Sequence, residues 1–162
     1  MNTDDPVAVD KSAVSPKNND KAQSDDPIEC ALRDNIVDRI QAQPFTCVTA
    51  TTSVREAMKL MVDRQIACVL VEDHDVLVGV FADRDVLDKV CLEYEHVIDE
   101  PVTTVMSSAP VSVRQNDSAA KALSVMAVTG YRHVPVVDEN CKPVGIVSPQ
   151  RLAQFLSAYL ET

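Results

Sequence analysis

The sequence has only three glycines among its 162 residues, and it contains neither a G-x-G-x-x-G pattern nor a Walker-type loop. Loops that surround phosphate groups with backbone amides need such glycines, so the composition argues against nucleotide-hydrolysing and dinucleotide-dependent enzymes. Histidine is equally scarce, and the three histidines are never four positions apart. No Ser-His-Asp, Cys-His or paired-carboxylate arrangement is suggested by position either. The sequence therefore predicts a protein that is not an enzyme.

A disulfide framework and a zinc knuckle are also missing. The cysteines are odd in number and scattered, and no C-x-x-C pair occurs. We expect reduced, mostly buried thiols and no metal. A metal site assembled from these thiols with His74, His96 or His133 stays open, because ligands can converge in space without a sequence spacing. The cysteines are Cys30, Cys47, Cys68, Cys91 and Cys141.

No apolar run approaches the roughly 18 to 20 residues that cross a bilayer. The N-terminus carries aspartates where a secretion signal has basic and then apolar residues. We expect a cytosolic protein, and its 46% hydrophobic content indicates a globular core. The formal net charge of −10 disfavours nucleic acid and anionic membranes as partners, so a small anionic ligand would need a local basic pocket.

What the chain does contain is an internal repeat. Residues 51–85 align with a stretch that begins at Gln115, first at an offset of 65 residues and then, after one extra residue in the second turn, at 66. Self-similarity at a fixed period indicates two copies of one structural unit. The aligned pairs are Ser53 with Ser118, Ala57 with Ala122, Met61 with Met126, Val69 with Val134, Val71 with Val136, and Gly79 with Gly145.

Each copy has the pattern of a β-α-β-β-α unit. In the first copy Val54, Ala57 and Met61 share one face of a helix, and Ser53 with Glu56 forms a capping box at its start. Two β-rich runs around a polar turn follow, CVLV and VLVGVF in the first copy and VPVV and PVGIV in the second, and a second helix comes next. A further strand candidate, FTCVT or PVSVR, precedes each first helix.

These patterns divide the chain into four parts. Residues 1–30 are too polar to bury a face, and we expect them to form a disordered tail. Residues 31–92 form the first repeat with a leading helix, residues 93–101 a polar linker, and residues 102–162 the second repeat with a C-terminal helix. A unit of about 55 residues buries too little surface to stand alone. The expected fold is therefore α+β, with the two repeats packed sheet to sheet around a pseudo-two-fold axis.

Two segments carry a resemblance to a known family. The first is GVFADRDVL, which starts at Gly79, and the second is YRHVPVVDENCKPVGIVS, which starts at Tyr131. Duplicated, in order and at this spacing, they resemble a tandem pair of cystathionine β-synthase (CBS) domains, often called a Bateman module. The similarity runs from about Ile36 to Leu156. It implies a regulatory module that binds AMP, ADP, ATP or S-adenosylmethionine in two clefts between the paired domains, without a covalent cofactor.

In this family the Thr or Ser and the Asp of the motif ending contact ribose and phosphate. The first copy has Asp85 but carries Ala82 at the hydroxyl position, and the second copy has Ser148 but carries Arg151 at the aspartate position. A carboxylate suits a ribose because its two oxygens can accept from both sugar hydroxyls. We therefore expect the Asp85 cleft to be the better ribose site. The second cleft would be empty, weak, or adapted to a more phosphorylated ligand that Arg151 holds.

A ligand phosphate would need donors, and each candidate residue also has a purely structural interpretation. Asp83 and Asp85 lie where a helix dipole favours acids, and we favour a helix-cap role for Asp83. Ser148 is a helix cap whether or not it also contacts ligand, and the basic residues before VPVV can be solvated strand residues. By resemblance, the phosphate donors near the clefts are Arg84, Arg132, His133 and Arg151.

The final helix, RLAQFLSAYL, carries apolar residues on more than one face, which is more than packing on a small sheet requires. By resemblance, this surface would form a homodimer. Because the sequence has no catalytic or transport domain, the chain would act as a free-standing sensor on an unidentified partner protein. The alternative is a ligand-free dimerisation or scaffold module.

Overall fold

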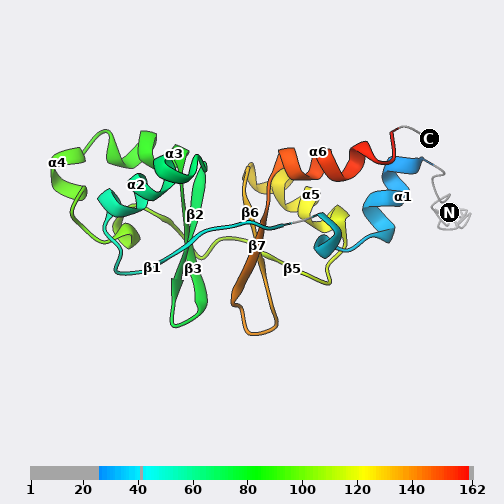
Figure 1. Ribbon diagram of the computed structural model, residues 1–162, viewed down its shortest axis with the longest axis horizontal. Coiled ribbons are helices and arrows are strands. Elements are labelled where there is room, and N and C mark those ends of the chain that lie inside the picture. Colours follow the sequence, from blue (N-terminus) through cyan, green and yellow to red (C-terminus); the bar gives the residue numbers. More distant parts are fainter. Residues whose placement is uncertain (1–25, 41, 161–162) are drawn as a thin grey trace, which may run out of the picture.

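The computed structural model describes residues 26–40 and 42–160, which form two αβ units side by side (Figure 1). The predicted tail of residues 1–30 lies almost wholly outside the described residues. None of the described helices combines the length and the apolarity that crossing a membrane requires. The elements in chain order are α1 (Pro27–Asp34), η1 (Val37–Ile40), β1 (Cys47–Thr49), α2 (Val54–Arg64), β2 (Cys68–Asp73), β3 (Val76–Ala82), α3 (Asp83–Asp85), the π-helical turn η2 (Val86–Val90), α4 (Tyr94–Val97), η3 (Val102–Thr104), β4 (Ser107–Ser108), β5 (Val113–Arg114), α5 (Ala119–Thr129), β6 (Val134–Val137), β7 (Pro143–Val147) and α6 (Pro149–Ser157).

Each unit contains a sheet built around one antiparallel hairpin. The first sheet has the strand order β1-β2-β3-β4 and the second has the order β5-β6-β7. In both sheets the strand before the first long helix pairs in parallel with the first strand of the hairpin. Figure 1 shows the β2–β3 and β6–β7 hairpins beside each other at the centre, with α2 and α5 toward the outside. The predicted α+β fold of two β-α-β-β-α repeats is confirmed.

The long helices begin where their capping residues predict. Ser53 Oγ accepts the Glu56 amide at 3.2 Å, and the Glu56 carboxylate accepts the Ser53 amide at 3.1 Å, which completes the predicted capping box of α2. The hydroxyls of Ser118 and Ser148 cap α5 and α6. Gly130 caps the end of α5 and has a φ of 70°, which favours glycine. Because these starts and stops are fixed, the apolar face of each helix is directed toward a sheet.

The segment that leads into each repeat packs on the other repeat. Val37 and Ile40 are buried in the hydrophobic core of the second unit. Val102 and Val105, which lie 65 residues further along, are buried in the core of the first unit. Leu32 of α1 also packs against the second core. The leading helix α1 therefore packs with the second unit, although the sequence pattern grouped it with the first repeat, residues 31–92. The domain limits themselves stay a prediction.

The aligned glycines, Gly79 and Gly145, lie where the leading segments cross the sheets. We call these the exchanged segments, because each packs on the other repeat. A Cβ atom on Gly79 would be 2.1 Å from Met106 Sδ, and one on Gly145 would be 2.6 Å from Ala42 Cβ. Atoms in a packed interior do not approach so closely. A side chain at Gly79 would therefore require the Met106 side chain to move, and one at Gly145 would require the Ala42 backbone to move. The repeat of glycine in the sequence thus corresponds to the same close crossing in both units.

The apolar residues of α6 are largely used inside the molecule. Leu152 is buried, and Phe155 and Leu156 pack against the second core, where η1 also lies. The expected surplus of apolar surface is therefore wrong for Leu152, whereas Phe155 and Leu156 are only half-buried. The homodimer expected on this surface stays a prediction. Leu160, at the end of the chain, is 70% exposed.

Candidate functional site

A cavity of about 400 Å³ lies between the two units, at the end of β3. Its walls come from three segments that are distant in sequence: residues 80–89, residues 107–110 and residues 130–133. The fold therefore brings the GVFADRD motif of the first repeat and the YRH triplet of the second repeat to one site. The predicted ligand residues that line it are Ala82, Arg84, Asp85, Arg132 and His133.

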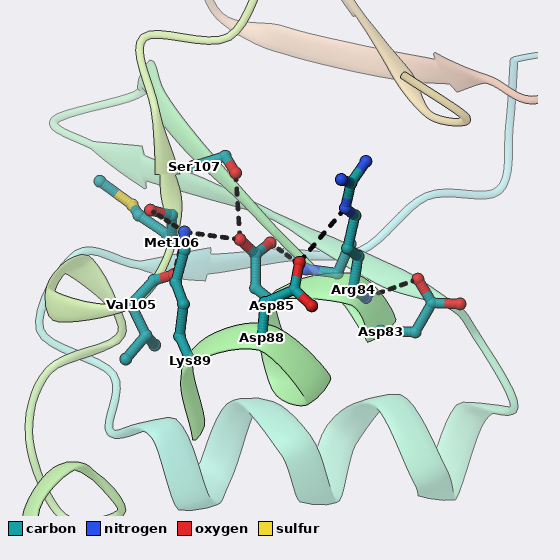
Figure 2. A network of polar contacts seen from close by, with 9 residues as sticks. Asp83, Arg84, Asp85, Asp88, Lys89, Val105, Met106 and Ser107 are labelled. Atoms are coloured by element: carbon teal, nitrogen blue, oxygen red, sulfur yellow. Dashed lines mark hydrogen bonds and ion pairs between the residues drawn. The ribbon is translucent and has the colours of Figure 1, made fainter. Parts of the chain in front are cut away.

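Asp85 is the buried carboxylate of this cavity, with only 6% of the residue exposed. Figure 2 shows the donors that reach it. Lys89 Nζ lies 2.7 Å from Asp85 Oδ1, and Ser107 Oγ lies 3.0 Å from the same oxygen. The backbone amide of Ala82 donates to Asp85 Oδ2 at 3.0 Å. A carboxylate has about four lone-pair sites, so these three donors leave one acceptor site on Oδ2.

Lys89 joins this carboxylate to the segment that enters the second repeat. Besides its ion pair with Asp85, its ammonium group donates to the carbonyls of Val105 at 2.8 Å and Met106 at 3.2 Å. An ammonium group has three donors, so all of those on Lys89 are in use. The Asp85–Lys89 pair therefore fixes η2 against the connecting segment at the edge of the cavity.

The basic residues of the cavity differ in how freely they can meet a ligand. Arg84 Nε lies 3.3 Å from Asp88 Oδ2 in an exposed pair, as Figure 2 shows. Arg132 is exposed, and within the described residues its guanidinium forms no ion pair or hydrogen bond. Burial lowers the pKa of His133 below its ordinary value; the carboxylate of Asp83 acts against this effect, and Arg132 adds to it. The imidazole is therefore a neutral group at pH 7.

Ser148 and Arg151 lie away from this cavity, at the matching place in the second unit. Arg151 Nη1 donates to the Ile146 carbonyl at 2.9 Å, and its Nη2 donates to the Pro44 carbonyl. Phe45, the next residue, packs against the apolar cluster between the two sheets. The guanidinium that the sequence offered to a phosphate is therefore engaged by carbonyls of its own chain, and it ties the exchanged segment to the second unit.

The two side chains that donate to Asp85, those of Lys89 and Ser107, were not predicted, and neither was Asp88, which pairs with Arg84. Lys89 lies four positions after Asp85 on helical backbone, and this opposite-charge spacing is a signal that sequence reasoning could have used. Ser107 has no such signal, because the repeat places Ala42 opposite it. Asp83, favoured as a helix cap, follows the cap position at Ala82, and among residues 26–40 and 42–160 its carboxylate accepts only the Arg84 amide, at 2.8 Å.

The thiols and histidines do not gather at a common site in the described part of the chain. No group of three His, Cys, Asp or Glu side chains there is arranged to hold a metal ion. Cys68 is buried as expected, and burial raises the pKa of its thiol to about 12. Cys30 and Cys47 are half-buried, and Cys91 and Cys141 are exposed, so the expectation of mostly buried thiols is wrong: Cys68 alone among the five is buried.

Comparison with known proteins gives one family for both halves of the chain. The family model for the CBS domain matches residues 37–91 and again residues 102–158. The CBS domain-containing protein CBSCBSPB1 of Arabidopsis thaliana is 31% identical over 115 residues, which are 70% of this chain and 21% of that protein. The chain thus spans about a fifth of the length of such plant relatives.

Solved structures give the same arrangement. The crystal structure of CBSX2 from Arabidopsis thaliana in complex with AMP matches with a TM-score of 0.63 and 27% identity, over 74% of this chain and 92% of that one. The CBS domain pair of protein MJ0100, in complex with 5′-methylthioadenosine and S-adenosyl-L-methionine, matches with a TM-score of 0.67 over 75% and 99% of the two chains. Its identity of 20% supports the fold alone. Since one family model covers both repeats, this chain belongs to the CBS domain family and carries two CBS domains in tandem.

Proposed function

We propose that this chain is a non-catalytic regulatory CBS pair, which binds one adenosyl ligand in the Asp85 cleft and signals to a separate partner protein. The observation that carries the proposal is a single cavity that combines a buried carboxylate with two guanidinium groups and a neutral imidazole. Its volume of about 400 Å³ falls in the range of about 300 to 1,000 Å³ that small-molecule sites occupy. The AMP complex of CBSX2 supports an adenosyl group as the ligand.

The ribose would be held by Asp85 and Ser107 together. Asp85 keeps one acceptor site, which is enough for one sugar hydroxyl. Ser107 Oγ uses its proton on Asp85, and its lone pairs remain to accept the second hydroxyl. The two hydroxyls would thus be read by two adjacent acceptors rather than by the carboxylate alone.

The two ends of the ligand would meet different surfaces. Val80, Pro110 and Tyr131 line the cavity with apolar atoms, on which a purine ring can pack. Arg84 and Arg132 provide the charged donors that a phosphate requires. The ligand would therefore contact both repeats at once, since Val80 and Arg84 belong to the first repeat and Arg132 to the second.

One ligand per chain is the expected stoichiometry. In the second unit Arg151 stands where the first has Asp85, and Phe45 stands where the first has Pro110. Arg151 offers no acceptor to a ribose, and two of its nitrogens already donate to backbone carbonyls. Calorimetric titration that gave two equal sites per chain would contradict this part of the proposal.

Thermal denaturation with AMP, ADP, ATP and S-adenosylmethionine tests the proposal directly. A ligand that binds only the folded state adds about 2.7 kcal/mol of stability at 100 times its Kd. For a chain of this size we expect the Tm to rise by about 5 to 10 °C with at least one of the four compounds. No rise with any of them would remove the sensor function and favour a scaffold.

A matched pair of variants tests the ribose contact. Ser107→Ala removes one acceptor, so the Kd for AMP should rise about two- to tenfold, the effect of one neutral hydrogen bond. Ser108→Ala, the exposed neighbour, should leave the Kd unchanged. With 2′-deoxy-AMP or 3′-deoxy-AMP, whichever lacks the hydroxyl that Ser107 accepts, the effect of Ser107→Ala should disappear. Equal losses for both serine variants would show that Ser107 does not contact the sugar.

A ligand-free dimerisation module is the second candidate. An apolar groove of about 390 Å³ lies between α2 and the α3–η2 segment, and Met58, Val62 and Leu87 are among the residues that line it. Val62 is 75% exposed and Leu87 is 67% exposed. Exposed apolar surface of this kind is typical of interaction sites. A stable dimer that no adenosyl compound stabilises would favour this alternative.

A further inference from the structure

The Asp85 cleft is lined by equal numbers of negative and positive side chains, but not all of the positive ones have an N–H group left to donate to a ligand. Three carboxylates and three cationic groups line it, beside the neutral imidazole of His133. Lys89 is fully used by Asp85 and by two backbone carbonyls, so it has no N–H left for a ligand. The cations that remain for a phosphate are therefore Arg84 and Arg132.

Arg84 and Arg132 can each take up a phosphate oxygen. The pair between Arg84 and Asp88 has side chains that are 83% and 60% exposed. Exposed pairs contribute little, so a phosphate can replace Asp88 as the partner of Arg84. Arg132 can bind a phosphate without losing a partner, because its guanidinium has no hydrogen bond or ion pair among the described residues. Two guanidinium groups match the two negative charges of one phosphate monoester.

Further phosphates would meet carboxylates instead of cations. Asp83 lines the same cavity, and no basic side chain lies within ion-pair distance of its carboxylate in the part of the chain that the structure describes. Its charge acts on the His133 ring, the neighbour of Arg132 in the chain, so its field reaches the wall of the cleft that carries one of the two free guanidinium groups. Asp88, once displaced from Arg84, adds a second negative charge nearby. Like charges that are not neutralised oppose binding.

We propose that Asp83 makes this cleft selective for charge, so that it binds an adenosyl ligand with one phosphate in preference to ADP and ATP. The inference rests on the proposed function, because it concerns the ligand of the same cleft. It assigns Asp83 a role in specificity rather than in helix capping alone. The expected order of affinity is AMP, then ADP, then ATP, with a loss of about fivefold for each added phosphate.

Isothermal titration of the full chain with adenosine, AMP, ADP and ATP, without magnesium, tests this order. Asp83→Asn keeps an acceptor for the Arg84 amide but removes the charge, so the fold is retained. In this variant the affinity for ATP should rise about fivefold, while the affinity for AMP changes by less than about twofold. Asp63→Asn removes the same charge from an exposed position of α2 that does not line the cleft. This control variant should leave the affinities for AMP and for ATP unchanged.

Ionic strength gives a second measurement on the unaltered protein. Salt screens the repulsion, so the preference for AMP over ATP should narrow as the salt concentration rises from about 0.05 to 0.5 M. If ATP binds as tightly as AMP, or if Asp83→Asn and Asp63→Asn act alike, charge selection by Asp83 is wrong while the adenosyl site stands. If no adenosyl compound binds at all, the proposed function fails and this inference fails with it.

Discussion

Asp85 and Ser148 each accept a backbone amide at the start of a helix, one in each repeat. The first amides of a helix have no intrahelical partner. In the second repeat the Ser148 hydroxyl accepts the Arg151 amide at 3.4 Å. In the first repeat Ala82 stands at the cap without a polar side chain, and the Asp85 carboxylate reaches back to its amide. The two bonds are opposite halves of a capping box: the Ser148 hydroxyl at the cap accepts an amide of the first helical turn, whereas the Asp85 carboxylate in the first turn accepts the amide of the cap residue. Of the two side chains, Asp85 is the one that lines the cavity between the repeats.

The Asp85 network should also contribute to stability. In Asp85→Asn, Lys89 loses its ionic partner, and one of the three donors now faces an amide NH₂ group. Since Lys89 is 42% exposed and can reach water, we expect a loss of about 1 to 3 kcal/mol in the free energy of unfolding, below the cost of breaking a fully buried pair. Urea denaturation measures this loss.

Asp99→Asn is the matched control for that substitution. Asp99 pairs with Arg55 at 2.8 Å, but both side chains are more than half exposed. Such surface pairs contribute little to stability, so the urea midpoint should stay nearly unchanged. Equal losses in the two variants would mean that Asp85 is no more than another surface charge.

The residue scale also shows how far the sequence can predict the site. Asp85 and Arg84 were proposed from the motif ending of the first repeat, Arg132 and His133 from the residues before VPVV in the second, and all four line one cavity. Their ligand roles stay predictions. What the sequence did not contain is the set of partners that each side chain has already taken. Arg151 has the same charge as Arg132, yet only three-dimensional packing decides that its donors meet the Ile146 and Pro44 carbonyls.

At the scale of elements, local patterns were sufficient for the helices and hairpins but not for the leading segments. The α2 boundaries follow from the capping box and from apolar spacing, both of which are local. The exchange of η1 and η3 between the units is not local. A repeat identifies which residues are equivalent, and it does not say onto which of two equivalent sheets a leading segment folds. Val37 and Val102 are equivalent positions of the repeat, so the sequence is equally consistent with each valine packing on its own unit or on the other one.

The exchange makes η1 part of the second core, and this has a measurable consequence. Ile40 is 2% exposed there. We expect Ile40→Ala to cost about 2 to 5 kcal/mol of unfolding free energy, the usual effect of emptying a buried aliphatic site. Ile36→Ala, four residues earlier at a position that is 39% exposed, should cost much less. A small loss for Ile40→Ala, measured by urea denaturation, would mean that the leading segment is only a tether.

At the scale of the whole molecule, the cleft and the contact between the repeats share one surface. Cys68, Leu70, Val80 and Ile146 form the buried cluster between the two sheets. Val80 also lines the cleft. A ligand that contacts both repeats would therefore favour the arrangement in which this cluster is closed, and a partner protein would sense the change in the population of closed molecules.

The Cys68 thiol provides a reporter for that closure. It is 8% exposed, and burial raises its pKa to about 12, so a thiol reagent reaches it only when the two sheets separate. If the open form does not bind AMP, AMP at 100 times its Kd should slow the labelling of Cys68 about 100-fold. Mass spectrometry of labelled peptides measures each cysteine separately, and the exposed Cys91 and Cys141 serve as internal controls whose rates should not change. An unchanged Cys68 rate at AMP concentrations that raise the Tm would show that the ligand binds without holding the two repeats together, and population shift could not then be the signal.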